Sequence, residues 1–226
     1  MLFIVEFFSH LYQQKEIAEE QEYLAKQAAL MRAKIETTVF QEVFAANSLV
    51  IIANLDKQFT INNWRSITSA LSNNSALIRN IALAPNNVIQ FVYPFEGNER
   101  AIGFDYRTNP EQLATVEQAR LTKKVFIAGP LELVQGGEAL IVRFPLFNQA
   151  HDGESYWGTL SVVLDVNSLY QLLKLDQQNN ITYALKGVDG TGEQGALFFG
   201  DEATFSNADT LMQIQIPSGE WQLAAT

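Results

Sequence analysis

The first quarter of the chain has the hydrophobic pattern of one long helix. Between Gln13 and Leu55 there is neither proline nor glycine, and apolar residues recur in steps of seven, four or three. This spacing gathers them on one stripe, with charged residues turned outward. The positions on the predicted stripe are Ile17, Leu24, Ala28, Met31, Ile35, Val39 and Val43.

A helix of about forty residues is longer than a small core needs, so its first half is expected to project from the domain. The projecting stripe then needs a partner, and we expect the same helix of a second copy, which predicts a homodimer. The alternative is a helix that lies along its own domain.

The next hundred residues alternate short apolar runs with turn residues. Residues 66–71 and 76–78 are predicted as short helices, ended by Pro85. Val88–Tyr93 and Ala101–Tyr106 are predicted as the two strands of a hairpin around a polar loop. Asn109 and Pro110 have the residue types of a helix N-cap and first turn, so a helix is expected from there.

The last hundred residues predict a series of strands with one further helix. Strands are expected in "VFIAGPLELV", "ALIVRFPLF", "YWGTLSVVLDV" and "NITYALKGV", and a short helix from Asn167. A glycine-rich hairpin follows at 189–201, and the chain ends in a strand pair that turns at Pro217–Gly219.

Sequential antiparallel hairpins with short helices are typical of an α+β fold. We expect a long N-terminal helix (residues 1–60) followed by two antiparallel-sheet modules, at residues 61–170 and 171–226.

Composition excludes several classes of function. The formal net charge is −10, which argues against nucleic-acid binding because phosphates require a basic face. The chain has no cysteine and only two histidines, so neither a disulfide scaffold nor a metal site is expected. The apolar start "MLFIVEFF" is too short to span a bilayer, but it and the mid-pattern end indicate a piece of a longer chain. A complete small protein is the alternative.

The sequence offers little support for catalysis. It contains no Gly-x-Ser-x-Gly nucleophile motif, and "GTG" at 190–192 is an isolated turn rather than a phosphate loop. We therefore predict no enzymatic activity and no cofactor.

Two charged residues inside apolar runs are candidates for ligand binding. If "AIGFDYR" is a strand, Asp105 lies on the face opposite Phe104 and Tyr106. Its carboxylate can accept hydrogen bonds from a ligand, or it can be an exposed residue that caps the next helix. Arg143 in "LIVRFPLF" must pair, face water or bind an anion, with Asp105 or Glu132 as possible partners.

The segment from residue 76 to 170 resembles the CHASE domain, a sensory domain found outside the membrane in bacterial and plant receptors. The resemblance is carried by "YPFEGNE", "IGFD", "AR" at 119–120, "GPLELVQGG" and "RFPLF", which occur in the family's order and spacing.

The resemblance implies two PAS-like modules, of which the membrane-distal one binds a small ligand. It also implies a periplasmic location, flanking transmembrane helices and an output such as a histidine kinase or diguanylate cyclase. In the plant cytokinin receptors of the family, the ligand contacts match Asp105, the backbone of Ile127, and Thr159 and Ser161 here.

The chain also departs from those receptors. A pocket threonine of theirs aligns with Arg143 and a pocket glycine with Ser161, and both changes narrow the cavity. We therefore expect a small polar or anionic ligand, anchored by Asp105 and Arg143, rather than an adenine-type compound. The expected walls are Phe91, Tyr93, Phe104 and Tyr106. The alternative is a structural or adaptor domain with a vestigial pocket.

Overall fold

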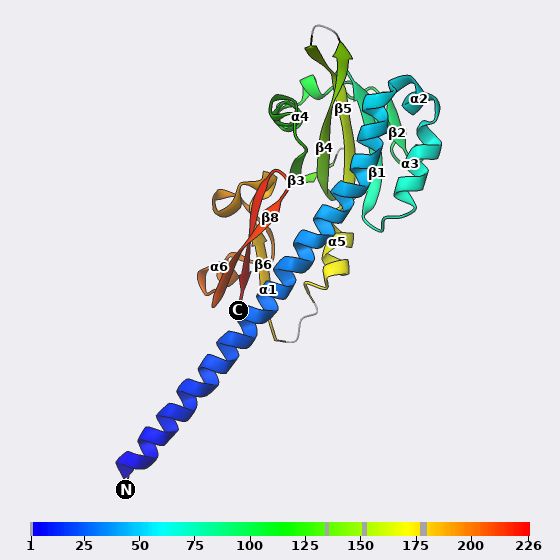
Figure 1. The fold of residues 1–226 in the computed structure, drawn as a ribbon. Coiled ribbons are helices and arrows are strands. Elements are labelled where there is room, and N and C mark those ends of the chain that lie inside the picture. The colour runs from blue at the N-terminus through cyan, green and yellow to red at the C-terminus, as the bar shows by residue number, and fades with distance from the viewer. Residues whose placement is uncertain (1, 134–135, 151–152, 177–179) are drawn as a thin grey trace.

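The computed structural model describes residues 2–133, 136–150, 153–176 and 180–226, and it shows one long helix that carries two antiparallel sheets (Figure 1). This is the mixed α+β architecture that the sequence predicts.

The helix α1 (Leu2–Leu55) connects the two sheets along its length (Figure 1). From Leu24 onward its apolar stripe is buried, and the stripe shares one hydrophobic core with residues of both sheets. The preceding turns project beyond the domain, and Ile17 is 54% exposed. The sequence predicted that the start of the helix projects. It also predicted that the apolar stripe packs on a second copy, but most of that stripe packs on the two sheets of the same chain. By length and composition α1 is also apolar enough to cross a membrane, a test that a core helix passes as well.

The sheet that lies farther from the exposed start of α1, called the distal sheet, has the strand order β2-β1-β5-β4-β3 (Figure 1). Helix α1 packs on one of its faces together with α3, while α4 covers part of the other face. Its strands are β1 (Ile78–Pro85), β2 (Phe91–Tyr93), β3 (Phe126–Glu132), β4 (Glu138–Ala150) and β5 (Gly153–Asp165), and its helices are α2 (Lys57–Asn62), α3 (Trp64–Ser72) and α4 (Pro110–Thr122).

The proximal sheet has the order β7-β6-β9-β8 and lies nearer to the exposed start of α1 (Figure 1). A backbone amide of β8 is tied to α1, since Gln215 N donates to Glu36 Oε1 at 2.9 Å. This module comprises β6 (Tyr183–Lys186), β7 (Leu197–Phe199), α6 (Glu202–Ser206), β8 (Thr210–Ile216) and β9 (Gly219–Ala225), with α5 (Val166–Leu173) leading into it.

The structure corrects three of the predicted elements. The helix expected at 76–78 is absent: residues 76 and 77 form a bend, and Ile78 begins β1 by pairing with Leu164 of β5. The segment expected as a strand at 101–106 runs from the end of one single turn, η1 (Glu99–Ala101), to the start of another, η2 (Tyr106–Thr108). Between them Gly103 adopts φ +81°, in the left-handed region, which interrupts extended structure. The face assignment based on strand alternation therefore does not apply to Asp105.

The region predicted as a glycine-rich hairpin likewise consists of two single turns, η3 (Val188–Gly190) and η4 (Gly192–Gln194), before the short strand β7. The expected helix at Asn109 is present, and the Asn109 side chain accepts from Gln112 N at 3.0 Å. The final hairpin, β8–β9, turns where the sequence predicts.

The two modules meet along the outer edge of β3. The Ile127 amide donates to Ser218 Oγ at 2.9 Å, and the Gly129 amide donates to Asp189 Oδ1 at 2.6 Å. An edge strand exposes unpaired amides of this kind, and here the proximal loops satisfy two of them.

We predict that Leu49→Ala destabilises the protein by about 2 to 5 kcal/mol, because Leu49 is 1% exposed in the core shared by α1 and both sheets. The matched control is Leu121→Ala on α4, where the leucine is 76% exposed and little stability should be lost. Urea denaturation of both variants measures the difference, and equal midpoints would contradict the packing described for α1.

Candidate functional site

A cavity of about 60 Å³ lies on the distal sheet, on the face turned away from α1. The floor comes from β1, β4 and β5, while α4 and the turns after β2 form the cover. The polar residues of the lining are Asn80, Arg100, Tyr106, Gln112, Arg143 and Ser161. All of the other lining residues are apolar, Phe104 among them.

The sheet positions the polar floor in one cross-strand row. Ser161 of β5 lies between Ala82 of β1 and Arg143 of β4 in the strand register. Because strand residues alternate between faces, these side chains point away from α1 while their neighbours pack on it. Small apolar clusters on the same face, one around Ala82 and one around Ile141, flank the row.

The guanidinium of Arg143 is the centre of the site. The residue is 1% exposed, and Nη1 donates to Ser161 Oγ at 2.9 Å. Nη2 donates to Gln112 Oε1, while Nε is buried and has no hydrogen-bond partner among the described residues. The ring of Tyr106 lies 4.6 Å from the guanidinium carbon, and its hydroxyl lies 3.2 Å from Ser161 Oγ. Neutral groups thus surround a buried cation.

In the part of the chain that the structure describes, no carboxylate lies within ion-pair distance of Arg143. The two partners considered from sequence do not take that role. Asp105 pairs with Arg107 instead, and Glu132 is exposed at the end of β3. A buried charge without a counterion is costly, so the cavity favours an anion.

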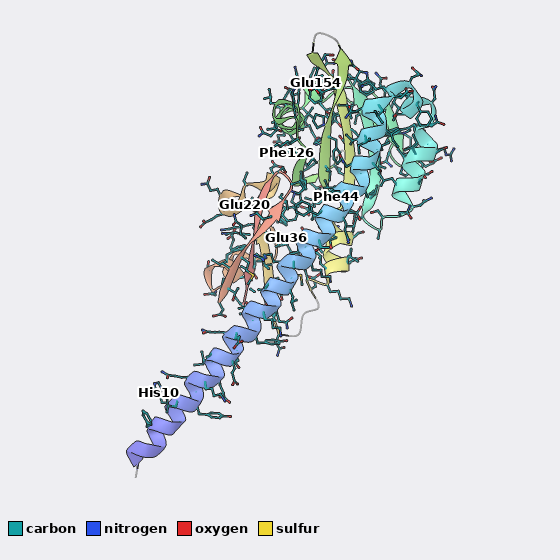
Figure 2. All side chains as sticks on the ribbon, in the orientation of Figure 1. His10, Glu36, Phe44, Phe126, Glu154 and Glu220 are labelled. Atoms are coloured by element: carbon teal, nitrogen blue, oxygen red, sulfur yellow. The ribbon has the colours of Figure 1, made fainter. Side chains whose placement is uncertain are left out.

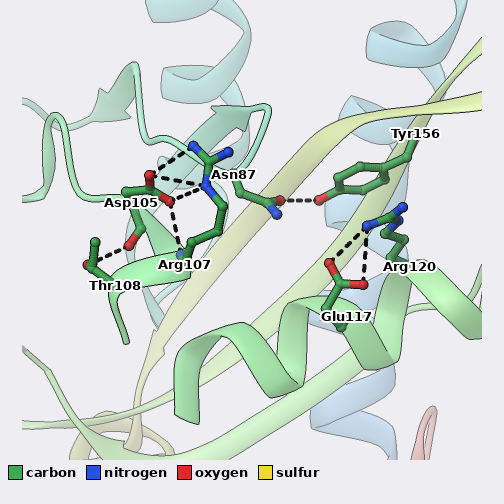
Figure 3. Close-up of polar contacts among 7 residues, drawn as sticks. All are labelled: Asn87, Asp105, Arg107, Thr108, Glu117, Arg120 and Tyr156. Carbon is green, nitrogen blue, oxygen red and sulfur yellow. Dashed lines mark hydrogen bonds and ion pairs between the residues drawn. The ribbon is translucent and has the colours of Figure 1, made fainter. Parts of the chain in front are cut away.

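Asp105 lies outside the cavity lining and is held by local contacts (Figure 3). Its carboxylate accepts from Nε and Nη2 of Arg107 at 2.8 Å each, and from the Arg107 amide at 2.9 Å. The hydrogen bond from the Arg107 side chain, followed by the one from its amide, holds the pKa of Asp105 below its usual value. The sequence-based placement of Asp105 as a cavity anchor is corrected: it caps η2.

Thr159 and Ser161 lie on the same face of β5, but only Ser161 lines the cavity. Thr159 belongs to a neighbouring polar cluster around Tyr156, part of which is drawn in Figure 3. The Tyr156 hydroxyl is 2.7 Å from Thr159 Oγ1 and donates to Asn87 Oδ1 at 2.6 Å. Burial raises the pKa of Tyr156, and Arg120 stacks over its ring at 4.9 Å.

The remaining predicted residues point elsewhere. Phe91 and Tyr93 pack on the α1 side of the sheet, where Phe91 lies 6.1 Å from the Trp64 ring. The Ile127 amide is bound by Ser218 of the proximal module. Of the nine residues predicted from sequence, the structure therefore places four at the cavity: Phe104, Tyr106, Arg143 and Ser161.

Sequence reasoning missed Gln112, Arg100 and Asn80. The N-cap at Asn109, which the sequence predicts, places Gln112 in the first turn of α4. The sequence does not predict that Gln112 contacts Arg143, because the two residues are thirty-one positions apart in the chain. Arg100 sits in the turn that was expected to be a plain loop, and Asn80 in a strand that was predicted as the end of a helix.

The family model of the CHASE domain matches residues 58–199, more than half of the chain. The chain belongs to the CHASE domain family. The match covers all of the distal sheet and the start of the proximal one, so the cavity lies inside it. No curated protein matches this CHASE domain.

Solved structures with the same fold are sensory domains of bacterial receptors. The ligand-binding domain of the Pseudomonas aeruginosa amino acid chemoreceptor PctC, in complex with GABA, has a TM-score of 0.67 at 13% identity, over 91% of this chain and 98% of that one. The sensory domain of the Campylobacter jejuni chemoreceptor Tlp3 has a TM-score of 0.66 at 14% identity, over 94% and 95%. An extracellular ligand-binding receptor from Desulfohalobium retbaense gives 0.68 at 14% identity, over 88% of this CHASE domain but only 39% of that protein.

We predict that Arg107→Ala raises the pKa of the Asp105 carboxyl toward its ordinary value, because the main contacts that lower it come from Arg107. Titration of the side-chain carboxyl by NMR, followed from neutral to acid pH, measures the change. Arg120→Ala is the control, since Arg120 pairs with Glu117 and should leave the Asp105 titration where it is. An unchanged pKa in Arg107→Ala would contradict the pairing.

Proposed function

We propose that this CHASE domain is the extracytoplasmic ligand-sensing part of a membrane-anchored receptor, with the ligand bound in the cavity over Arg143. The observation that supports the proposal most strongly is the buried guanidinium that lines the cavity without a carboxylate partner in the described chain. A purely structural arginine would be expected to find a counterion, since burial of an unpaired charge destabilises a fold.

The structural neighbours support a small organic ligand. Complexes of such domains with GABA and with L-valine are among them, and both compounds carry a carboxylate. At identities of 13% these ligands do not transfer to this chain directly. They agree with the charge that the Arg143 site favours.

Signalling requires a ligand that binds one arrangement of the protein better than another, because equal affinity for both shifts nothing. The cavity lies between the sheet and a cover formed by α4 and the turns after β2. A ligand in the cavity therefore contacts both the sheet and the cover. In the proposed receptor, the conformational change caused by ligand binding is transmitted to a cytoplasmic histidine kinase or diguanylate cyclase, as the family resemblance implies.

The proposed receptor is a homodimer that pairs through an outer face of α1. This face is not the predicted stripe but a second one, defined by Tyr23, Leu30, Phe44 and Ile51, which are 53% to 74% exposed. Their positions differ by multiples of seven, the repeat of a helix pair. Phe44, labelled in Figure 2, lies on α1 between the two sheets and is the most exposed of the four.

A non-sensing structural or adaptor domain is the competing function. In that case the cavity would be vestigial and Arg143 would bind nothing.

We expect a thermal-shift screen of a metabolite library to yield at least one compound that raises the melting temperature, because a ligand of the folded state stabilises it. For that compound, Arg143→Lys should weaken affinity about tenfold or more, since lysine cannot reproduce the planar fork of donors. Asp105→Ala should leave affinity nearly unchanged, because Asp105 does not line the cavity. Isothermal titration measures both, and a screen with no hit would favour the adaptor function.

We expect the protein to sediment as a dimer, with Leu30→Glu and Phe44→Glu each shifting it to the monomer mass, because a charge on an apolar helix seam opposes pairing. Leu121→Glu, on the exposed surface of α4, is the control and should remain dimeric. A monomer mass for the unaltered chain at every concentration tested would refute the α1 dimer.

A further inference from the structure

The donor groups of Arg143 are used unequally, which gives information about the ligand. Nη1 donates to Ser161 and Nη2 to Gln112, both neutral partners, and Nε has no partner in the part of the chain that the structure describes. Gln112 can supply one oxygen to this side of the guanidinium, whereas a carboxylate supplies two.

The same chain shows what a fully occupied fork looks like. Arg107 uses Nε and Nη2 together on the carboxylate of Asp105, with both of those contacts at 2.8 Å. In Arg143 this Nε–Nη2 edge is only half used, because Gln112 Oε1 reaches Nη2 alone. The vacant half is a buried donor, which is costly to leave unpaired.

The charges of the lining add a second constraint. Among the described residues of the lining, Arg143 and Arg100 are cationic and none is acidic. Asp105, which stands between the lining residues Phe104 and Tyr106 in the sequence, already accepts four hydrogen bonds from Arg107 in a contact outside the lining. An ammonium group that entered the cavity would therefore lose water without gaining a counterion.

The size of the cavity sets a third constraint. Its volume of about 60 Å³ exceeds what one buried water needs, but it is far below the 300 to 1,000 Å³ typical of drug-sized pockets. The apolar part of the lining, with Phe104, Ile141 and Val163, suits a short hydrocarbon portion.

We infer that the ligand is a short-chain carboxylate without an amino group, and that its two oxygens take the Nε–Nη2 edge of Arg143 in place of Gln112. This inference rests on the proposed function and narrows it, because the neighbours named above are complexed with amino acids. Gln112, in the first turn of α4, is a positioning residue that holds the empty site and yields to the ligand.

The first test compares compounds of matched shape by isothermal titration of the unaltered protein. Propanoate, propanamide and L-alanine differ in the charge of the head group and in the presence of an ammonium group. Propanoate is expected to bind, with propanamide about tenfold or more weaker, because hydrogen bonds to an ionised acceptor are stronger. L-Alanine should be weaker by a similar factor, because its ammonium group has no partner.

The second test alters Gln112 and leaves Arg143 in place. Gln112→Glu supplies a permanent carboxylate at the fork, so it should abolish propanoate binding and raise the melting temperature of the free protein. Gln112→Ala, the matched control, removes the competing oxygen and should retain propanoate binding or strengthen it.

The outcomes separate this inference from the proposed function. If L-alanine or propanamide binds as tightly as propanoate, or if Gln112→Glu still binds propanoate, the carboxylate assignment is wrong while the sensory cavity stands. If propanoate fails to bind and the ligand that the metabolite screen yields is not a short-chain carboxylate, the inference is likewise wrong and the proposed function stands. If neither propanoate nor any screened compound binds, both fall.

Discussion

The whole molecule depends on one apolar stripe of α1. From Leu24 to Ala53 the buried residues of this helix join a single core that includes Leu140 and Val142 of the distal sheet and Trp221 and Leu223 of the proximal one. Neither sheet has a separate core on that side. Because packed interiors accept few arrangements, a displacement of one sheet along α1 is felt by the other. The helix therefore acts as a common support rather than as a simple tether.

The opposite face of the distal sheet is built on a different principle. Its row of Ala82, Ser161 and Arg143 places a cation between two small apolar clusters. The guanidinium donates hydrogen bonds to the neutral side chains of Ser161 and Gln112 and lies over the face of the Tyr106 ring. These contacts lower the cost of burial but do not cancel the charge. Stability alone would be served better by an apolar residue at position 143. The anion site proposed above would give the arginine a physical reason to be there.

The sequence predicted the fold where local pattern and tertiary packing agree. The long helix, the strands β3 to β5 and the N-cap at Asn109 follow from period, turn residues and capping chemistry. It failed at Gly103, whose left-handed backbone turns an alternating apolar segment into two single turns, and so it misplaced Asp105. Arg143 was found because a charge in an apolar strand is visible locally. Its contact with Gln112 was not, because it depends on how α4 packs across the sheet.

The position of α4 connects the cavity to the proximal module through contiguous structure. Gln112 contacts Arg143 at the start of this helix, and the helix ends at Thr122, four residues before β3 begins. The outer edge of β3 is in turn held by Ser218 and Asp189 of the proximal loops. A ligand that displaces Gln112 acts on the first turn of α4, so any shift of that helix bears directly on the strand that joins the modules. Spatial continuity alone does not establish coupling, which requires two arrangements of these elements with different ligand affinities. The amides of Ile127 and Gly129 donate to Ser218 and Asp189, and these described contacts between β3 and the proximal loops are a place where two such arrangements can be compared.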